Sequence, residues 1–146
     1  MKCFRGLVLA TLLAAGAAAQ AEVIPVDPAG LQALRERGVP LIDVRTPEEW
    51  AQTGVIPGSH RLTFFDAQGR YDARAWLAEL RRIAGPGQPV ALICHSGNRS
   101  GAIAEFLSRK IGYETVYDAE QGMVGWQSQA RPVVAMDGEC SSDQPC

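Results

Sequence analysis

The sequence predicts an α/β domain with a central, mostly parallel sheet flanked by helices. Short apolar runs of strand length alternate with segments whose apolar residues recur at helical spacing. Turn-forming glycines and prolines separate the two kinds of segment. This alternation is typical of βαβ units, in which helices cover a sheet of parallel strands. Ligands of such domains bind outside the carboxyl ends of the strands, so the loops that follow the strands are the candidate sites.

The individual elements follow from local patterns. The expected strands are the short apolar runs at residues 23–26, 39–44, 62–64, 89–93 and 115–117. Asp27, Thr46 and Asp72 each stand where a side-chain oxygen caps the start of a helix, and proline follows the first two at the first helical position. Two later helices are indicated by apolar residues at helical spacing. These are Ile103, Phe106, Leu107 and Ile111 in one helix and Met123 and Trp126 in the other.

The first 21 residues differ from the rest of the chain in composition. Lys2 and Arg5 precede a nearly continuous apolar run over residues 7–19, and Ala19-Gln20-Ala21 has the small residues of a cleavage site. We expect residues 1–21 to be a signal peptide that is cleaved after Ala21, giving a periplasmic or secreted protein. The alternative is an uncleaved membrane anchor, but the apolar run is short for a span of about 20 residues. No stable membrane insertion is expected after cleavage.

The rest of the chain is long enough for one domain with a single core, expected at residues 22–135. A mobile tail is expected at residues 136–146. The whole chain has 14 basic and 16 acidic side chains, and removal of Lys2 and Arg5 leaves 12 basic side chains against 16 acidic ones. The acidic balance and the absence of any Lys/Arg run give no support to nucleic-acid binding.

Cleavage would leave three cysteines, Cys94, Cys140 and Cys146. An oxidising compartment pairs exposed thiols, and the simplest partition bridges Cys140 to Cys146 and leaves Cys94 free and reactive. The sequence does not supply the geometry of a disulfide, so unpaired tail cysteines remain an alternative. In a third arrangement, a tail thiol attacks or resolves Cys94.

The stretch Cys94-His95-Ser96-Gly97-Asn98-Arg99-Ser100 combines a nucleophile with anion-binding features. It follows the apolar run 90–93 and precedes a helical segment, which places Cys94 at the end of a strand and beside a helix N-terminus. The N–H groups there are unpaired and attract anions, so this position favours a thiolate and holds a negatively charged ligand. We expect Cys94 to be the catalytic nucleophile. The expected substrate-binding residues are His95, Ser96, Gly97, Asn98, Arg99 and Ser100.

Each of these side chains also has a structural interpretation. Cys94 could be a buried structural cysteine, although the glycine-containing loop and Arg99 that follow it favour reactivity. Arg99 could pair with a carboxylate, although its place at the start of the helix favours anion binding. His95 either donates to the substrate or is solvated, and Ser96 and Ser100 either donate their hydroxyls or cap the helix.

Several residues outside this loop are expected to be structural. Asp43 and Arg45 are expected to form a structural ion pair or hydrogen-bond network rather than to do chemistry. Arg61 is expected to be a solvated arginine rather than part of the pocket. The three tryptophans are expected to anchor the core. They are Trp50, Trp76 and Trp126.

Four motifs, in order, resemble those of the single-domain rhodanese family. They are LIDVRTPEEW at 41–50, GVIPGS at 54–59, CHSGNRS at 94–100 and GMVGW at 122–126. Each motif alone is weak, but their order and spacing agree over roughly residues 23–135. The resemblance implies a rhodanese-like fold, and the expected signal peptide makes the protein an exported form of the family.

The resemblance also implies sulfurtransferase activity. Cys94 would take the outer sulfur of a donor such as thiosulfate, become a persulfide, and pass the sulfur to a thiophilic acceptor such as cyanide or a thiol, including the thiol of a protein. No metal and no organic cofactor is required. The sequence departs from the family pattern at four positions, which concern substrate preference more than the fold or the nucleophile. These positions are Val55, Arg61, His95 and Gln121.

Two rival functions belong to other classes. Cysteine phosphatases and arsenate reductases of the related fold separate the cysteine and the arginine by five residues, whereas four separate Cys94 from Arg99. The shorter loop favours a sulfur-sized cradle. The other rival is a non-catalytic periplasmic sulfur carrier or binding module, which would hand the persulfide only to a partner protein. The sequence does not identify the physiological donor, the acceptor or the oligomeric state.

Overall fold

The computed structural model describes residues 21–136 and contains a five-stranded sheet. The strand order is β1-β5-β4-β2-β3, and every paired strand runs parallel to its neighbour. This arrangement confirms the predicted α/β fold class. The strands are β1 (Glu22–Val26), β2 (Leu41–Asp43), β3 (His60–Arg61), β4 (Val90–Ile93) and β5 (Thr115–Ala119).

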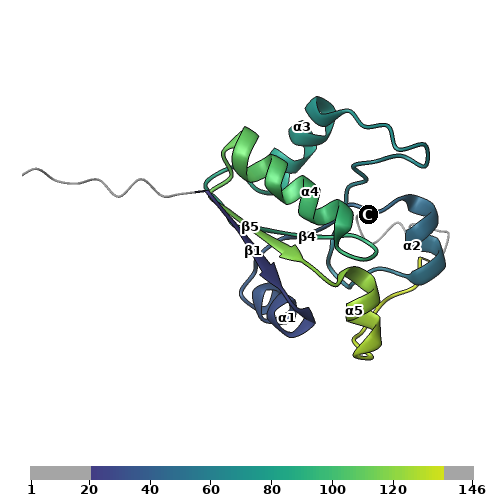
Figure 1. The fold of residues 1–146 in the computed structure, drawn as a ribbon. Helices are drawn as coiled ribbons and strands as arrows, with labels where there is room; N and C mark the ends of the chain where they lie inside the picture. The colour runs from purple at the N-terminus through teal and green to yellow at the C-terminus, as the bar shows by residue number, and fades with distance from the viewer. Residues whose placement is uncertain (1–20, 137–146) are drawn as a thin grey trace, which may run out of the picture.

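Helices lie on both faces of the sheet: in Figure 1, α3 and α4 lie on one side, and α1 and α5 on the other. The helices are α1 (Pro28–Glu36), α2 (Pro47–Thr53), α3 (Ala73–Ile83), α4 (Asn98–Phe106) and α5 (Gly122–Ser128). A π-helical turn at Leu107–Ile111 continues α4. The expected caps are confirmed, because Asp27, Thr46 and Asp72 each accept a hydrogen bond from a first-turn N–H group. Within residues 21–136, no helix is long and apolar enough to cross a membrane.

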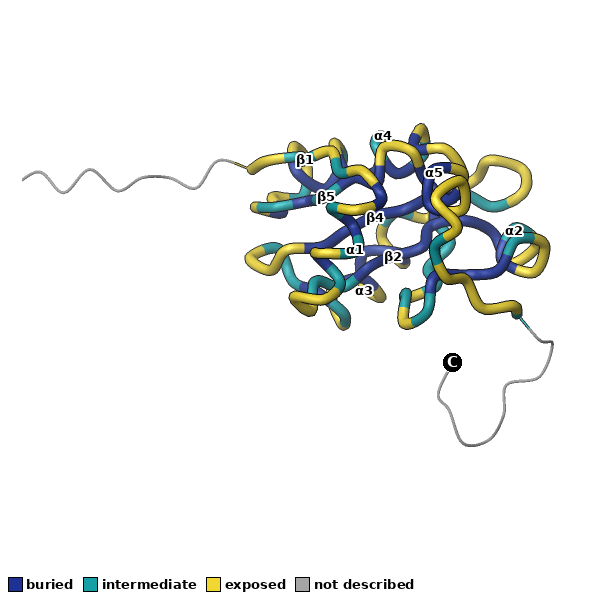
Figure 2. The backbone as a smooth tube through the Cα atoms, turned by 90° about the horizontal axis from the view of Figure 1, so that it is seen from below, coloured by how far each residue is buried: buried dark blue, intermediate teal, exposed yellow. Residues whose placement is uncertain are grey.

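The core has one layer on each face of the sheet, since successive strand residues point to opposite sides. The layer under α3 and α4 includes Leu92 and Cys94 of the β4 region, and the layer under α1 and α5 includes Ala91 and Ile93. Figure 2 shows the central strands as the buried part of the chain and the helices as partly exposed. The three tryptophans are between 0% and 8% exposed, which confirms them as core residues.

Several of the expected strand bounds were wrong in detail. The strand expected at 62–64 is β3 instead, two residues earlier, although the N–H groups of Leu62 and Phe64 still donate to the carbonyls of Asp43 and Val44. The strand β5 extends to Ala119, two residues beyond the expected end. The segment 132–136 pairs back onto the domain through an antiparallel bridge between Val134 and Val55. Residues 1–20 of the expected signal peptide and the proposed Cys140–Cys146 bridge lie outside the described residues.

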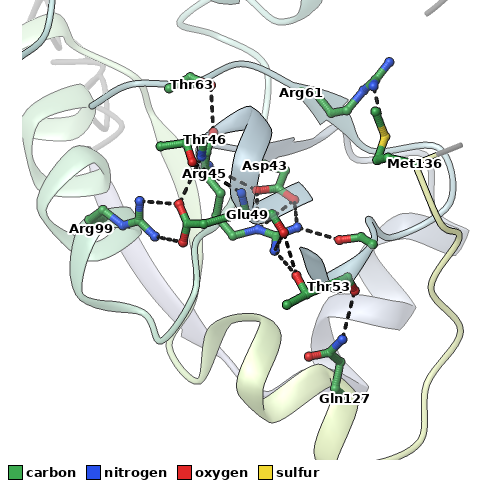
Figure 3. A network of polar contacts seen from close by, with 11 residues as sticks. Asp43, Arg45, Thr46, Glu49, Thr53, Arg61, Thr63, Arg99, Gln127 and Met136 are labelled. Carbon is green, nitrogen blue, oxygen red and sulfur yellow. Dashed lines mark hydrogen bonds and ion pairs between the residues drawn. The ribbon is translucent and has the colours of Figure 1, made fainter. Parts of the chain in front are cut away.

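A buried ion pair joins β2 to α2, as expected from the sequence. Asp43 and Arg45 are both 0% exposed, and Arg45 Nη2 lies 2.6 Å from Asp43 Oδ2. The same guanidinium donates to Thr53 Oγ1 at 2.6 Å and to the Gly54 carbonyl at 2.8 Å (Figure 3). A buried charge pair is stable only when its remaining hydrogen-bonding groups are satisfied, and these contacts satisfy them. Arg45 therefore holds the C-terminal end of α2 against the end of β2.

Replacement of this arginine should be strongly destabilising. Arg45→Met keeps much of the side-chain volume but leaves the Asp43 carboxylate buried and unpaired, so we expect the free energy of unfolding to fall by about 3–5 kcal/mol. Urea unfolding at neutral pH measures the change. The matched control is Arg70→Met, which breaks the exposed Arg70–Asp66 pair and should cost less than about 1 kcal/mol. Equal losses of unfolding free energy in the two variants would show that the buried pair stabilises the fold no more than the exposed pair does.

Candidate active site

The candidate active site is centred on Cys94, which directly follows β4 and precedes the loop that leads into α4. Its side chain belongs to the core layer under α4 and is 1% exposed. The Gly97 N–H donates to Cys94 Sγ at 3.1 Å, and the Ser100 hydroxyl lies 3.5 Å from the same sulfur. Donors aimed at a sulfur stabilise its negatively charged form. The loop therefore places two hydrogen-bond donors where they can stabilise a negative charge on the sulfur.

Two glycines let the Cys94 loop lie directly against the turn that begins α5. Gly97 has φ +96°, and a Cβ atom there would lie 1.9 Å from the Glu120 carbonyl oxygen. Gly122 has φ +56°, and a Cβ atom there would lie 2.5 Å from the His95 carbonyl oxygen. Both positions combine a backbone conformation that other residues rarely adopt with a contact that a side chain would block. Glycine is thus required on each side of this contact.

The N-terminus of α5 also binds the Cys94 loop through its backbone. The Met123 N–H donates to the Cys94 carbonyl at 2.9 Å, and the Val124 N–H donates to the His95 carbonyl at 3.1 Å. First-turn N–H groups of a helix have no acceptor within the helix, so these carbonyls satisfy them. The nucleophile is consequently held from both sides, by α4 through its side chain and by α5 through its main chain.

Arg99 forms a bidentate ion pair with Glu49 of α2. Its Nη1 and Nη2 atoms lie 2.8 and 2.5 Å from the two Glu49 carboxylate oxygens. Glu49 also accepts from the Thr46 N–H at 3.0 Å as part of a capping box. Hydrogen bonds from Arg99, followed by the Thr46 N–H, lower the pKa of Glu49 to about 2. Figure 3 shows Glu49 between Arg99 and the Asp43–Arg45 pair.

This pairing revises the expectation for Arg99. We expected the guanidinium to bind an anion in preference to pairing with a carboxylate, and the structure shows the pairing. Hydrogen bonding to Glu49 raises the pKa of Arg99, and the nearby Cys94 adds a smaller contribution in the same direction. The guanidinium therefore lies close to both Glu49 and the nucleophile, and its charge is largely balanced within the protein.

The other predicted site residues divide by exposure. His95, Ser96 and Asn98 are exposed, whereas Gly97 and Ser100 are buried. Ser100 does not cap α4, since the N-cap is Gly97 and no side chain occupies that role. Its hydroxyl donates instead toward the Gly97 carbonyl at 3.1 Å and toward Cys94 Sγ. The loop thus turns Ser100 inward and leaves three polar side chains at its surface.

Arg61 lies apart from this loop and is not the solvated arginine that we expected. Its guanidinium carbon lies 5.9 Å from the centre of the Trp50 ring, and its Nη1 lies 3.1 Å from Met136 Sδ. Figure 3 shows Arg61 beside Met136, away from the Arg99–Glu49 pair. Arg61 therefore helps attach the segment 132–136 to the domain.

Sequence reasoning missed two residues of the site. Glu49 carried a detectable signal, because Thr46 and Glu49 have the spacing of a capping box, but its partner Arg99 is 50 residues away in the chain. Asp118 lies on β5 beyond the end expected for that strand, and it is buried beside the first turn of α4. The charged residue in a strand that otherwise carries no charge would have been the signal.

Two further observations concern the surroundings of the site. A hollow of about 550 Å³ lies at the amino ends of the strands, where its lining includes Arg35, Leu41 and Arg82. That end of the sheet is opposite the end that carries Cys94, so the hollow takes no part in the chemistry at the thiol. Among residues 21–136, no group of three or more His, Cys, Asp or Glu side chains is placed to hold a metal ion.

The Glu49 carboxylate should make stability depend on pH. Its pKa of about 2 in the folded protein lies below its ordinary value of 4.5, so its ionised form stabilises the fold above pH 4.5, and this contribution is lost as the pH falls toward 2. We expect Glu49→Gln to lower the free energy of urea unfolding by about 1–2 kcal/mol at pH 7. The difference from wild type should shrink between pH 4.5 and pH 2.

The matched control for Glu49 is Glu79→Gln, which removes the carboxylate of the exposed Glu79–Arg82 pair. Exposed pairs contribute little, so this variant should differ from wild type by less than about 0.5 kcal/mol. A Glu49→Gln effect that is the same at pH 7 and near pH 2 would contradict the assignment of the effect to the carboxylate charge.

Comparison with known proteins agrees with this geometry. Residues 27–129 match the family model of the rhodanese-like domain. The chain is 30% identical over 103 residues to a protein named thiosulfate sulfurtransferase GlpE from Pseudomonas syringae pv. syringae, with 70% of this chain and 86% of the relative covered.

Solved structures show the same fold. A rhodanese-related protein from Thermoplasma volcanium is 30% identical, with a TM-score of 0.57 and coverage of 76% of this chain and 97% of its own. The crystal structure of Rv0390 from M. tuberculosis is 24% identical, with a TM-score of 0.62 and coverage of 77% and 97%. The family model and these likenesses together establish that the chain belongs to the rhodanese-like domain family.

Proposed function

We propose that the protein is a thiosulfate sulfurtransferase that carries a sulfur atom on Cys94. The supporting observation is the thiol at the carboxyl end of β4, with the Gly97 N–H 3.1 Å from its sulfur and the Ser100 hydroxyl 3.5 Å away. The naming of a 30% identical relative as a thiosulfate sulfurtransferase supports the same reaction class. Family membership supports a sulfurtransferase-type role, and thiosulfate as the sulfur donor is part of the proposal.

The reaction takes place in two displacements at sulfur. The Cys94 thiolate attacks the outer sulfur of thiosulfate, a new S–S bond forms, and the bond to the inner sulfur breaks so that sulfite leaves with the electron pair. The acceptor, cyanide or a thiolate, then attacks the outer sulfur of the persulfide and releases the Cys94 thiolate. No electrons are gained or lost overall. The loop donors that face the sulfur stabilise the negative charge before and after each transfer.

The Arg99–Glu49 pair affects which groups supply positive potential at the thiol. A free guanidinium would attract a dianionic donor strongly, but Arg99 is held by both Glu49 oxygens. Backbone N–H groups and the positive end of the α4 dipole then provide most of the field at the thiol. The paired arginine serves to hold α2 against the start of α4, and it contributes to donor binding through its remaining N–H groups.

We also propose that this reaction takes place outside the cytoplasm. The supporting feature is the basic and apolar leader that ends at Ala21, and the first strand begins at Glu22, so cleavage there leaves β1 whole. N-terminal sequencing of the protein recovered from a periplasmic extract is expected to begin at Glu22. Recovery of the uncleaved chain in the membrane fraction would show an anchored protein instead.

Turnover with thiosulfate and cyanide tests the proposed function. Cys94→Ser should lower kcat at least about 1000-fold, because the weaker oxygen nucleophile cannot carry the transferred sulfur. The matched controls are Cys140→Ser and Cys146→Ser, which remove other thiols and should keep the wild-type rate. The rate is measured as thiocyanate formed per enzyme.

The outcomes separate the two functional classes. Equal rates for Cys94→Ser and wild type would overturn the assignment of Cys94. A wild-type protein that gains one sulfur from thiosulfate but turns over neither cyanide nor small thiols would be a sulfur carrier that serves a partner protein. Steady-state rates over a panel of donors and acceptors then define the substrate.

A further inference from the structure

The Glu49 carboxylate holds the one side chain of the Cys94 loop that carries a permanent positive charge. Arg99 Nη1 lies 2.8 Å from Glu49 Oε2, and Arg99 Nη2 lies 2.5 Å from Glu49 Oε1. The pair is not sealed in the core, since the two side chains are 30% and 25% exposed. A ligand that enters from solvent therefore meets the arginine and the carboxylate together, and the charge of the pair bears on which ligands the site takes.

Arg99 belongs to the same turn as the donors that contact the sulfur. The Gly97 N–H and the Ser100 hydroxyl lie 3.1 and 3.5 Å from Cys94 Sγ, and Arg99 directly precedes Ser100 in the first turn of α4. Hydrogen bonding to Glu49 is the main cause that raises the pKa of Arg99, and the nearby Cys94 contributes in the same direction. A donor whose outer sulfur is at Cys94 thus brings its anionic group into the electrostatic field of Arg99.

The charge of Glu49 acts mainly on this guanidinium. Hydrogen bonds from Arg99 hold the pKa of Glu49 at about 2, so the carboxylate is ionised at neutral pH. The other arginine near Glu49 is Arg45, and its guanidinium is already paired with Asp43 at 2.6 Å. Figure 3 shows Glu49 with both of its oxygens directed at Arg99. The negative charge of Glu49 consequently offsets the positive charge that Arg99 would present to a ligand.

The loss of this positive charge matters most for ligands with the largest negative charge. The Coulomb energy between two groups is proportional to the product of their charges. Thiosulfate is doubly charged, whereas an organic thiosulfonate or a persulfide carries a single negative charge. Pairing of Arg99 with Glu49 therefore weakens the attraction of thiosulfate twice as much, in free energy, as the attraction of a singly charged donor.

We propose that Glu49, by neutralising Arg99, makes the donor site favour singly charged sulfur donors, such as organic thiosulfonates and persulfides, over doubly charged ones. The transfer is the same for each class: the Cys94 thiolate bonds to the outer sulfur, and the bond behind that sulfur breaks. Sulfite leaves from thiosulfate, a sulfinate from a thiosulfonate and a thiolate from a persulfide, each with the electron pair. The inference rests on the proposed function in that the donor binds at Cys94. Glu49 acts through Arg99 and is a positioning residue.

The variant Glu49→Gln removes the charge and keeps much of the local structure. Glu49 Oε2 accepts from both the Thr46 N–H, at 3.0 Å, and Arg99 Nη1. A glutamine oxygen at that position can keep both contacts, and glutamine also serves in a capping box. The matched control is Glu48→Gln, which removes the same charge from an exposed neighbour in the same turn of α2.

Donor kinetics with cyanide as acceptor test the charge preference. In Glu49→Gln we expect kcat/KM to rise about tenfold for thiosulfate and about threefold for the singly charged methanethiosulfonate, because the attraction is proportional to the donor's charge. Both gains should shrink at high salt. In Glu48→Gln both values should stay within about twofold of wild type. A purely structural role for Glu49 predicts a loss with both donors, so partial unfolding cannot imitate the expected gain.

A second measurement needs no sulfur transfer. Sulfate and methanesulfonate, which are unreactive and differ by one charge, are tested for protection of Cys94 against iodoacetamide. The sulfate concentration that gives half-protection should fall about tenfold in Glu49→Gln, and that of methanesulfonate about threefold. In an Arg99→Gln background the same substitution should give no gain, since the effect passes through the guanidinium. Circular dichroism confirms that each variant is folded.

The two measurements separate this inference from the proposed function. Half-protection by sulfate that is unchanged or weaker in Glu49→Gln would overturn the inference, and so would a gain that persists without Arg99. Equal changes for the singly and doubly charged ligands would also overturn it. A protein that transfers no sulfur from either donor, but shows the expected shift in protection, would refute the proposed function and leave the charge preference of the site supported.

Discussion

The arrangement of the site depends on a contact between two stretches of backbone. The Cys94 loop and the turn before α5 lie very close together. A Cβ atom at Gly97 would overlap the Glu120 carbonyl, and a Cβ atom at Gly122 would overlap the His95 carbonyl. The contact is reinforced by N–H groups at the start of α5, which donate to the carbonyls of Cys94 and His95. Because the main chain makes this contact, the exposed side chains of His95, Ser96 and Asn98 are not needed for it. The conformation that directs the Gly97 N–H at the sulfur is thus determined by β5, α5 and the glycines between the elements.

A second set of contacts supports the site from the side of α2. The buried Asp43–Arg45 pair holds the end of this helix, and the start of the helix presents Glu49 to Arg99. The charges alternate along this series, so each arginine is balanced by a carboxylate. A site with a balanced arginine depends more on backbone dipoles for its positive field. That dependence suits a chemistry in which the sulfur is negatively charged before and after each transfer.

Much of the fold could be predicted from the sequence, because local and tertiary preferences agree. The caps at Asp27, Thr46 and Asp72 are local signals, and the structure contains all three. The ends of strands were harder to predict. The strand β3 lies at an edge of the sheet, where two of its residues pair with β2, and the apolar run that follows it packs under α3 and α4 without belonging to the strand. The long-range pairing of Arg99 with Glu49 was missed because nothing local at Arg99 distinguishes a paired arginine from a free one. Asp118 was missed because its burial depends on how closely α4 approaches β5 at Gly101.

The central claim is that Cys94 is the nucleophile that carries the transferred sulfur atom. The most direct test is the mass of the protein after brief exposure to thiosulfate. The chain that lacks residues 1–21 is mixed with thiosulfate, desalted and digested without reductant, and the peptide that contains Cys94 is identified by tandem mass spectrometry. One added sulfur atom on Cys94, removed again by cyanide, is the predicted result. An unmodified Cys94 in folded protein, or an added sulfur found only on another cysteine, would contradict the claim.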